Sequence, residues 1–408
     1  MADEMLKYSS VLRLNFYTKL NICASIYATS PSPKPLSAIL RSTVLNNKQT
    51  EMKLTTVLFF SILSILTSCN GQTSNSKNHS VLLKEINVNG DTVKELGSSI
   101  MVIYQDKKNT YWFGSWETGV YKYDGKTLIN YTTKHGLQKN RIDEIKEDKL
   151  GNIYFNNGGE ISKFDGQNFI KVSSANNSNN EWKLEPDDLW FKGYQNSGLV
   201  YRYDGKYLHR LKFPETKEGD DYFAKFPNVK YSPYDVYIIY KDREGNVWFG
   251  TGALGVCLYN GKTFTWLSEN EMEFDVETGF GIRSIIEDSN GKFWFSNSLH
   301  RFNVYRQDNT IKYLKEKGLG SLDGKKDGDL VAIISMEKDN NDLWMATYNK
   351  GVYCYNGQQI THYPVKYNGK DITVFSIYKD NNGDLWLGTH ENGVYKFNGK
   401  TFEKFKPY

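Results

Sequence analysis

This sequence of 408 residues predicts an all-β fold of seven repeated units, and two observations support the prediction. The first is a short phrase that recurs seven times: an aspartate turn, an aromatic or apolar pair, a small residue, then Gly-apolar-Tyr-x-Tyr and an Asp-Gly or Asn-Gly turn. The pairs of the seven copies begin at Trp112, Ile153, Trp190, Trp248, Trp294, Trp344 and Trp386. A fixed period of about 40–50 residues indicates similar units packed side by side.

Each unit is expected to contain four short antiparallel strands. In the last copy these strands span 372–378, 385–389, 394–397 and 401–405. Asx-Gly pairs such as Asn398-Gly399 connect them, because they supply the positive φ that tight hairpins require. Four antiparallel strands per repeat are typical of a β-propeller blade, and propellers contain about 4–8 blades.

The second observation concerns the second strand of each unit, where two adjacent residues are both large and apolar, as in Trp248-Phe249. Neighbouring side chains point to opposite faces of a sheet, so both faces must be covered. A propeller meets this demand because a neighbouring blade packs on each side. We therefore predict a seven-bladed β-propeller of four-stranded antiparallel blades over residues 81–408. An array of β-sandwiches is the alternative.

The repeats resemble the two-component regulator propeller repeat. The segments that carry the resemblance are 286–294 (Ile-Glu-Asp-Ser-Asn-Gly-Lys-Phe-Trp), 380–389 (Asp-Asn-Asn-Gly-Asp-Leu-Trp-Leu-Gly-Thr) and 119–125 (Gly-Val-Tyr-Lys-Tyr-Asp-Gly). The match covers about residues 98–405 in register. The resemblance implies a periplasmic sensor-type propeller of the kind found in hybrid histidine kinases. Because the chain ends at Tyr408, we expect a stand-alone lipoprotein form without the kinase.

Three copies depart from the phrase. In the second, Asn156-Asn157 replaces Gly-Thr. In the third, Pro186-Asp187-Asp188 replaces the Asp-x-x-Gly turn, which predicts a shorter turn. In the fifth, the Gly-apolar-Tyr pattern of the third strand is replaced by His-Arg-Phe-Asn-Val-Tyr at 300–305.

A secretory signal with a lipobox is predicted at 52–69. Met52-Lys53 is basic, 54–66 is apolar but shorter than the about 20 residues that cross a membrane, and Cys69 follows small residues. We expect Cys69 to be lipidated, 70–80 to be a flexible tether, and 1–51 to be a disordered, mis-assigned upstream extension. The alternatives are an ordinary signal peptide and a genuine cytoplasmic extension. The expected location is the cell envelope of a Gram-negative-type bacterium, with a lipid anchor as the only membrane attachment.

Charge argues against a nucleic-acid partner. The whole chain carries a formal charge of +4, but residues 70–408 hold 44 basic and 44 acidic residues. A neutral domain lacks the basic surface that nucleic-acid binding requires. Cys257 and Cys354 lie in non-adjacent repeats, so we expect buried free thiols rather than a disulfide.

Ligand-binding residues are predicted at one end of the ring. Loops between blades vary in length, and variable loops on a rigid scaffold concentrate binding residues. The candidates on this face are Trp116, Glu117, Arg141, Tyr194, Arg283, Arg301, Tyr348, His390 and Glu391, with Tyr222, Phe223 and Tyr231 added by the long loop. Aromatic rings beside charged and amide groups suit a glycan, and a protein ligand, such as a signalling partner, is the alternative.

Neither a cofactor nor a metal is expected. The Asp-x-x-Gly turns lack the later ligands of a calcium loop, and the repeated aspartate six residues before the aromatic predicts turn capping instead. A binding module is favoured over an enzyme. A lyase or hydrolase resembling streptogramin lyase is the alternative, with His300, His390 and Glu391 as catalytic candidates by fold-level analogy. A structural scaffold of the cell envelope is the third hypothesis.

Overall fold

The computed structural model describes residues 89–175, 180–194, 197–272, 281–298, 300–307, 310–316 and 332–408. The predicted segments 1–51, 52–69 and 70–80, the Cys69 lipidation site and the start of the propeller at 81–88 lie outside these residues. Within the described ranges, no helix has the length and apolar character needed to cross a membrane.

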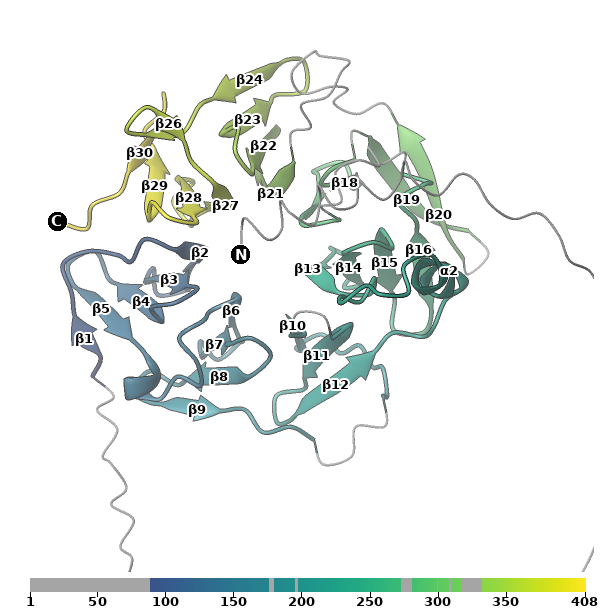
Figure 1. Cartoon of the computed structure of the whole chain (residues 1–408), viewed down its shortest axis with the longest axis horizontal. Coiled ribbons are helices and arrows are strands. Elements are labelled where there is room, and N and C mark those ends of the chain that lie inside the picture. Colours follow the sequence, from purple (N-terminus) through teal and green to yellow (C-terminus); the bar gives the residue numbers. More distant parts are fainter. Residues whose placement is uncertain are drawn as a thin grey trace, which may run out of the picture. The chain divides into compact units, whose positions relative to one another are not determined.

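Seven antiparallel sheets follow one another around a ring, and the last lies next to the first (Figure 1). The first contains β2 (Ile100–Gln105), β3 (Tyr111–Ser115), β4 (Val120–Tyr123) and β5 (Leu128–Tyr131), with β1 (Asp91–Thr92) paired to β5. The second contains β6 (Glu144–Glu147), β7 (Ile153–Asn156), β8 (Ile161–Phe164) and β9 (Phe169–Lys171), and the third β10 (Leu189–Lys192), β11 (Leu199–Tyr203) and β12 (Leu208–Lys212).

The remaining four sheets each have four strands. The fourth contains β13 (Val236–Lys241), β14 (Val247–Thr251), β15 (Val256–Tyr259) and β16 (Phe264–Leu267), and the fifth β17 (Ile285–Glu287), β18 (Lys292–Phe295), β19 (Arg301–Gln307) and β20 (Thr310–Glu316). The sixth contains β21 (Ile333–Asp339), β22 (Asp342–Thr347), β23 (Val352–Tyr355) and β24 (Ile360–Tyr363), and the seventh β27 (Val374–Lys379), β28 (Leu385–Thr389), β29 (Val394–Phe397) and β30 (Phe402–Lys404). The predicted seven-bladed propeller is confirmed.

The third blade differs from the prediction, because its sheet has three strands among the described residues. Its aromatic strand β10 takes the innermost place (Figure 1). There the Lys192 N–H donates to Glu144 Oε2 of the second blade at 2.7 Å. The segment that other blades use as a first strand instead runs beside β12, where the indole of Trp182 donates to the Lys212 carbonyl at 3.1 Å. Pro186, which has no N–H for a strand ladder, lies in this segment.

Aromatic side chains of the second strands fill the seams on both sides of a blade. In blade 4, Trp248 is fully buried and its ring lies 4.5 Å from that of Phe293 in blade 5. Its neighbour Phe249 points the other way and lies 5.8 Å from Trp190 of blade 3. This arrangement confirms the reason given for adjacent apolar residues, since each face of the strand meets another blade.

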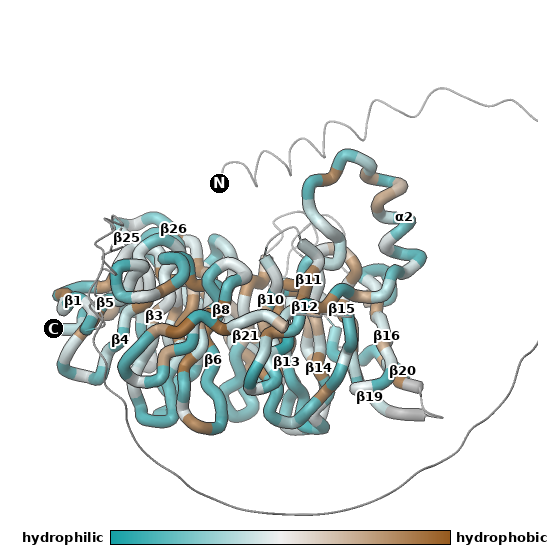
Figure 2. Tube along the Cα trace, turned by 90° about the horizontal axis from the view of Figure 1, so that it is seen from below, coloured by the Kyte–Doolittle hydropathy of each residue, from teal (hydrophilic) through white to brown (hydrophobic). Residues whose placement is uncertain are grey.

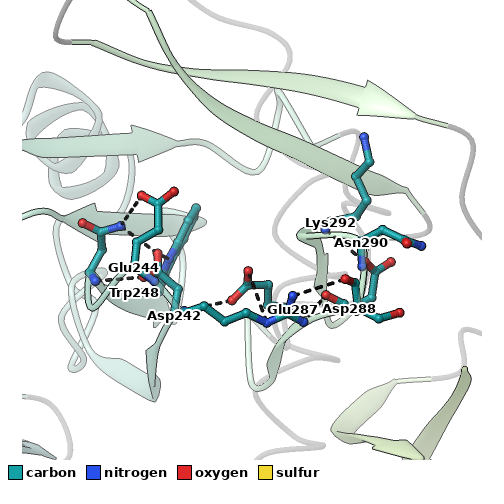
Figure 3. Close-up of polar contacts among 10 residues, drawn as sticks. Asp242, Glu244, Trp248, Glu287, Asp288, Asn290 and Lys292 are labelled. Carbon is teal, nitrogen blue, oxygen red and sulfur yellow. Dashed lines mark hydrogen bonds and ion pairs between the residues drawn. The ribbon is translucent and has the colours of Figure 1, made fainter. Parts of the chain in front are cut away.

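The turn aspartates cap the turn and also bind the aromatic ring (Figure 3). Asp242 Oδ1 accepts hydrogen bonds from the backbone N–H groups of Glu244 and Asn246, while Oδ2 accepts one from Trp248 Nε1 at 2.8 Å. The same bond joins the pairs Asp106 and Trp112, Asp288 and Trp294, Asp380 and Trp386, and, through a phenol, Asp148 and Tyr154. The predicted turn capping is confirmed, and the six-residue spacing is explained by the second bond.

The residue before each turn aspartate joins neighbouring blades. Glu287 Oε2 of blade 5 accepts a hydrogen bond at 3.0 Å from the Arg243 N–H in the turn of blade 4 (Figure 3). Glu147 accepts the equivalent bond from blade 1, and Gln105 accepts it from Asn381 of blade 7 at 2.7 Å. In the Glu-Asp pair of the repeat, the aspartate therefore closes its own turn, and the glutamate bonds to the turn of the preceding blade.

Two tryptophans lack the aspartate bond. The residue six positions before Trp344 is Lys338, and six before Trp190 is Leu184. Both indole N–H groups are buried and have no hydrogen-bond partner among the described residues. Unsatisfied buried donors cost free energy, so these two seams are held less firmly than the others.

This difference predicts unequal costs for the same substitution. Trp248→Phe removes the hydrogen bond from the indole N–H to Asp242 Oδ2. Trp344→Phe removes an indole N–H that has no hydrogen-bond partner among the described residues. We expect Trp248→Phe to lower the free energy of unfolding by about 1–3 kcal/mol more than Trp344→Phe does. Urea unfolding of the two variants measures this, and equal costs would contradict the account of the turn.

Cys257 and Cys354 are buried free thiols, as predicted. Burial raises the pKa of the Cys257 thiol, which therefore stays protonated at neutral pH. Both act as small core residues.

Candidate functional site

The two ends of the ring differ as predicted. The Asp-x-x-Gly turns are at one end, while the connections between blades lie at the other, which we call the linker end. Two insertions rise there (Figure 2): α2 (Lys217–Lys225) between blades 3 and 4, and the hairpin β25 (Lys366–Tyr367) and β26 (Lys370–Asp371) between blades 6 and 7. Thr216 caps α2 by accepting from the Gly219 N–H.

The innermost strands carry a β-bulge at the linker end. In four blades the register shifts after the first residue of the strand, so one extra residue enters the ladder. The bulged residues are Met101, Tyr237, Ile334 and Phe375. Bulges redirect a side chain and are frequent beside functional sites. Asp143 and Arg283 occupy the same position, five residues before the turn aspartate, in blades 2 and 5.

The structure gathers aromatic rings of three blades around Phe375. Its ring lies 5.8 Å from Trp116 of blade 1, 5.5 Å from His390 of its own blade and 6.1 Å from Tyr348 of blade 6. Trp116 and His390 also meet edge to face at 5.7 Å. These four side chains are partly buried, which leaves part of each ring accessible.

Two arginines extend the aromatic group. The guanidinium of Arg141 lies over the Trp116 ring at 4.8 Å, and its Nε donates to Asp143 at 2.8 Å. The guanidinium of Arg283 lies over the Tyr237 ring at 4.2 Å. Burial lowers the pKa of Arg283, and the nearby Tyr237 and Tyr348 act against that shift. We call the whole set the linker-end cluster; its members are Trp116, Arg141, Tyr237, Arg283, Tyr348, Phe375 and His390.

Other predicted residues surround this cluster. The ring of Tyr194 is exposed, packs on Gly158 and Gly159 of blade 2, and has the Lys139 ammonium 5.8 Å from its centre. Glu391 is exposed, with Oε1 3.4 Å from His390 Nδ1, and Glu117 is also exposed. These groups could contact a ligand that covers the linker-end cluster.

Arg301 lies elsewhere. Its guanidinium bonds to Glu316 Oε2 at 3.1 Å and lies 3.9 Å from Asp288, the aspartate that caps a turn at the opposite end. The prediction that Arg301 faces the linker end is wrong, because the irregular third strand of blade 5 pairs it with Trp294 inside the sheet. His300 precedes it in blade 5, two blades away from His390 and Glu391.

The sequence did not predict Phe375 and Tyr237, which lie on the first strands β27 and β13, or Asp143, which directly precedes β6. Their spacing is a usable signal, because each is the fifth residue before a turn aspartate. At Tyr237 and Phe375 this position is a β-bulge. The described residues contain no group of three or more His, Cys, Asp or Glu side chains placed to hold a metal.

A surface concavity of about 670 Å³ lies on blade 7 beside Trp344 and Asp339, at the end of the ring that carries the Asp-x-x-Gly turns. Its lining charges are largely paired: Lys396 contacts Asp384 at 2.7 Å and Asp339 contacts Lys379 at 3.3 Å. It is separate from the linker-end cluster.

Comparisons with known proteins agree with this architecture. Residues 230–253 and 368–391, in blades 4 and 7, match the model of the two component regulator propeller family. A histidine kinase, P4 from Formosa agariphila, is 24% identical over 269 residues, which are 60% of this chain and 18% of the kinase.

Solved structures of similar fold include a sensor domain and two lyases. The extracellular domain of a putative hybrid two component system from B. thetaiotaomicron has 19% identity and a TM-score of 0.50, covering 76% of this chain and 40% of that domain. Streptogramin B lyase has 12% identity and a TM-score of 0.54, and virginiamycin B lyase from Staphylococcus aureus has 12% and 0.52. The two lyases are covered over 97% of their length and align with 77% and 75% of this chain.

Proposed function

We propose that this chain is an extracytoplasmic binding or sensing module, anchored by lipid at Cys69, that takes a glycan at the linker end. The observation that carries the proposal is the linker-end cluster, in which separate blades place partly buried aromatic rings next to two arginines. Rings stack on the apolar faces of sugars, and arginine forks bind hydroxyl or carboxylate groups. The similarity to sensor regions supports an extracytoplasmic location and a signalling partner.

A glycan array probed with the full chain tests the ligand class. For an oligosaccharide that binds, we expect Trp116→Ala to weaken affinity by about tenfold or more, which corresponds to about 1.4 kcal/mol. The same loss is expected for Arg141→Ala. Tyr207→Ala is the matched control, because that ring is exposed on blade 3 beside an Asp-Gly turn at the opposite end. Equal affinities for the wild type and Trp116→Ala would refute this location.

The lipid anchor has its own test. We expect Cys69→Ser to abolish incorporation of labelled fatty acid and to leave the protein soluble. The thiol is the proposed acceptor of the diacylglyceryl group, and serine cannot replace it there. Labelling that persists in Cys69→Ser would count against the lipobox.

A lyase is the second candidate, favoured by the His390 and Glu391 contact at 3.4 Å and by the fold shared with the two lyases. Loss of turnover with retained ligand binding in His390→Ala or Glu391→Ala would support it. A structural scaffold would instead give no ligand binding together with a stable co-purifying protein.

A further inference from the structure

The guanidinium of Arg141 is held on two sides at the linker end. Its Nε donates to Asp143 Oδ1 at 2.8 Å, and its central carbon lies 4.8 Å from the centre of the Trp116 ring. Trp116 is itself packed against His390 and Phe375 of blade 7, with ring centres 5.7 and 5.8 Å apart. Both contacts restrict the orientations that the guanidinium plane can adopt.

The backbone that carries Arg141 is also fixed, and a departure from the repeat phrase explains how. Asn157 of blade 2 stands where other copies have threonine and is fully buried. Its Nδ2 donates to the carbonyls of Lys139 and Arg141 at 3.0 and 3.3 Å, and its Oδ1 accepts from Ser162 Oγ at 2.7 Å. In blades 4, 6 and 7 the threonine at this position bonds to a carbonyl of its own blade instead. The asparagine therefore ties the linker before β6 to blade 2.

The outer edge of the guanidinium remains available to a ligand. Its Nη groups have no hydrogen-bond acceptor among the described residues, and the side chain is 23% exposed. Asp143 occupies Nε alone, so the N–H donors of the two Nη groups form a planar fork. Such a fork matches the two oxygens of a carboxylate, and hydrogen bonds between charged partners are about twice as strong as those between neutral ones.

We propose that Arg141 binds a carboxylate of the ligand, so that the linker end recognises an acidic glycan in preference to a neutral one. Asp143 is a positioning residue, because it fixes the guanidinium through Nε and leaves the fork open. The inference rests on the proposed function and specifies its ligand class. A carboxylate in the fork lies next to the Trp116 ring, the surface on which the sugar stacks in the proposed binding mode.

Pairs of oligosaccharides that differ only at the carboxyl group test the proposal. The probes are oligosaccharides of galacturonate, glucuronate and mannuronate, each with its carboxyl-reduced form, titrated into the full chain at pH 7 by isothermal calorimetry. For at least one pair we expect the acidic member to bind about tenfold or more tightly than the reduced member. No binding of any acidic oligosaccharide would overturn the inference.

Arg141→Lys separates the fork from its charge. Lysine keeps the positive charge but lacks the planar pair of donors, so the ratio of the two affinities should fall to within about threefold. Lys134→Met is the matched control, because it removes an exposed cation from the same linker and should leave the ratio unchanged. An equal fall in both variants would show that overall charge, rather than the fork, selects the acid.

Asp143→Asn and Asp143→Ala separate positioning from charge. Both substitutions remove the negative charge beside Arg141, but asparagine keeps an oxygen that accepts from Nε. We expect Asp143→Asn to retain the preference for the acidic member and Asp143→Ala to lose it. If Asp143 acted through its charge alone, both variants would instead bind the acidic member more tightly than the wild type does.

Failure of this inference can be told from failure of the glycan proposal. Equal binding of the acidic and reduced members, with both weakened by Trp116→Ala, would overturn the acid preference and leave the glycan proposal intact. Acid-selective binding that requires Arg141 but is unchanged by Trp116→Ala would support the carboxylate contact and count against stacking of a sugar on this ring.

Discussion

Trp248→Ala should lower the free energy of unfolding by about 3–5 kcal/mol, as large-to-small changes in a close-packed core do. The ring is fully buried between blades 4 and 5, where it contacts Phe293 and Phe295 at 4.5 and 5.7 Å. Alanine leaves a cavity there and also removes the donor to Asp242. Urea unfolding measures the change.

Leu150→Ala provides the control for Trp248→Ala. Leu150 lies in the turn of blade 2 that Asp148 caps and is 79% exposed. Its truncation should therefore change the free energy of unfolding by no more than about 0.5 kcal/mol. A cost near zero for Trp248→Ala as well would mean that the second-strand rings do not hold the blades together.

Asp380→Asn should cost about 2–4 kcal/mol, because this carboxylate accepts four hydrogen bonds and is 4% exposed. Its Oδ2 accepts from Trp386 Nε1 at 2.8 Å and from Tyr111 of blade 1 at 2.6 Å, while Oδ1 accepts from the backbone of Asn382 and Asp384. The substitution therefore weakens the turn and the closure of the ring together.

The effect of Asp380→Asn should depend on pH. Burial alone would raise the pKa of Asp380, but the hydrogen bonds from Tyr111, Trp386 and the backbone outweigh it and lower the pKa. A lowered pKa in the folded state gives stability that is complete above the unfolded value of about 3.9 and is lost as pH falls through the folded value. The difference between wild type and variant should thus be full at pH 7 and shrink below pH 4.

Asp384→Asn is the matched control for this residue. Asp384 lies in the same turn, but its side chain is 43% exposed and pairs with Lys396. Exposed ion pairs contribute about 0–1 kcal/mol, so little change is expected. Similar decreases in the free energy of unfolding for Asp380→Asn and Asp384→Asn would show that the buried carboxylate of Asp380 has no special role in stability.

The repeat phrase predicted the fold well, because each of its parts has a local physical meaning. The Asp-Gly turns, the adjacent apolar pair and the six-residue spacing each specify one contact within or between neighbouring blades. That the described residues of blade 3 contain no inner first strand was not predicted. That difference depends on where Trp182 packs, and packing between distant segments leaves no periodic signal.

The candidate site was predicted only in part. Loop residues such as Trp116, Arg141 and Tyr348 do come together at the linker end. Phe375 and Tyr237 were missed because a bulge, rather than a loop, turns them toward neighbouring side chains. Arg301 was misplaced because the irregular strand of blade 5 shifted its position along the sheet.

The central claim is that ligand binds at the linker end of the ring. Amide hydrogen exchange of the full chain, with and without an oligosaccharide selected on the array, tests it most directly. We predict new protection at the starts of the inner strands, around Arg141, Tyr237 and Phe375, and at α2. Protection confined to the Asp-x-x-Gly turns at the opposite end would contradict the claim.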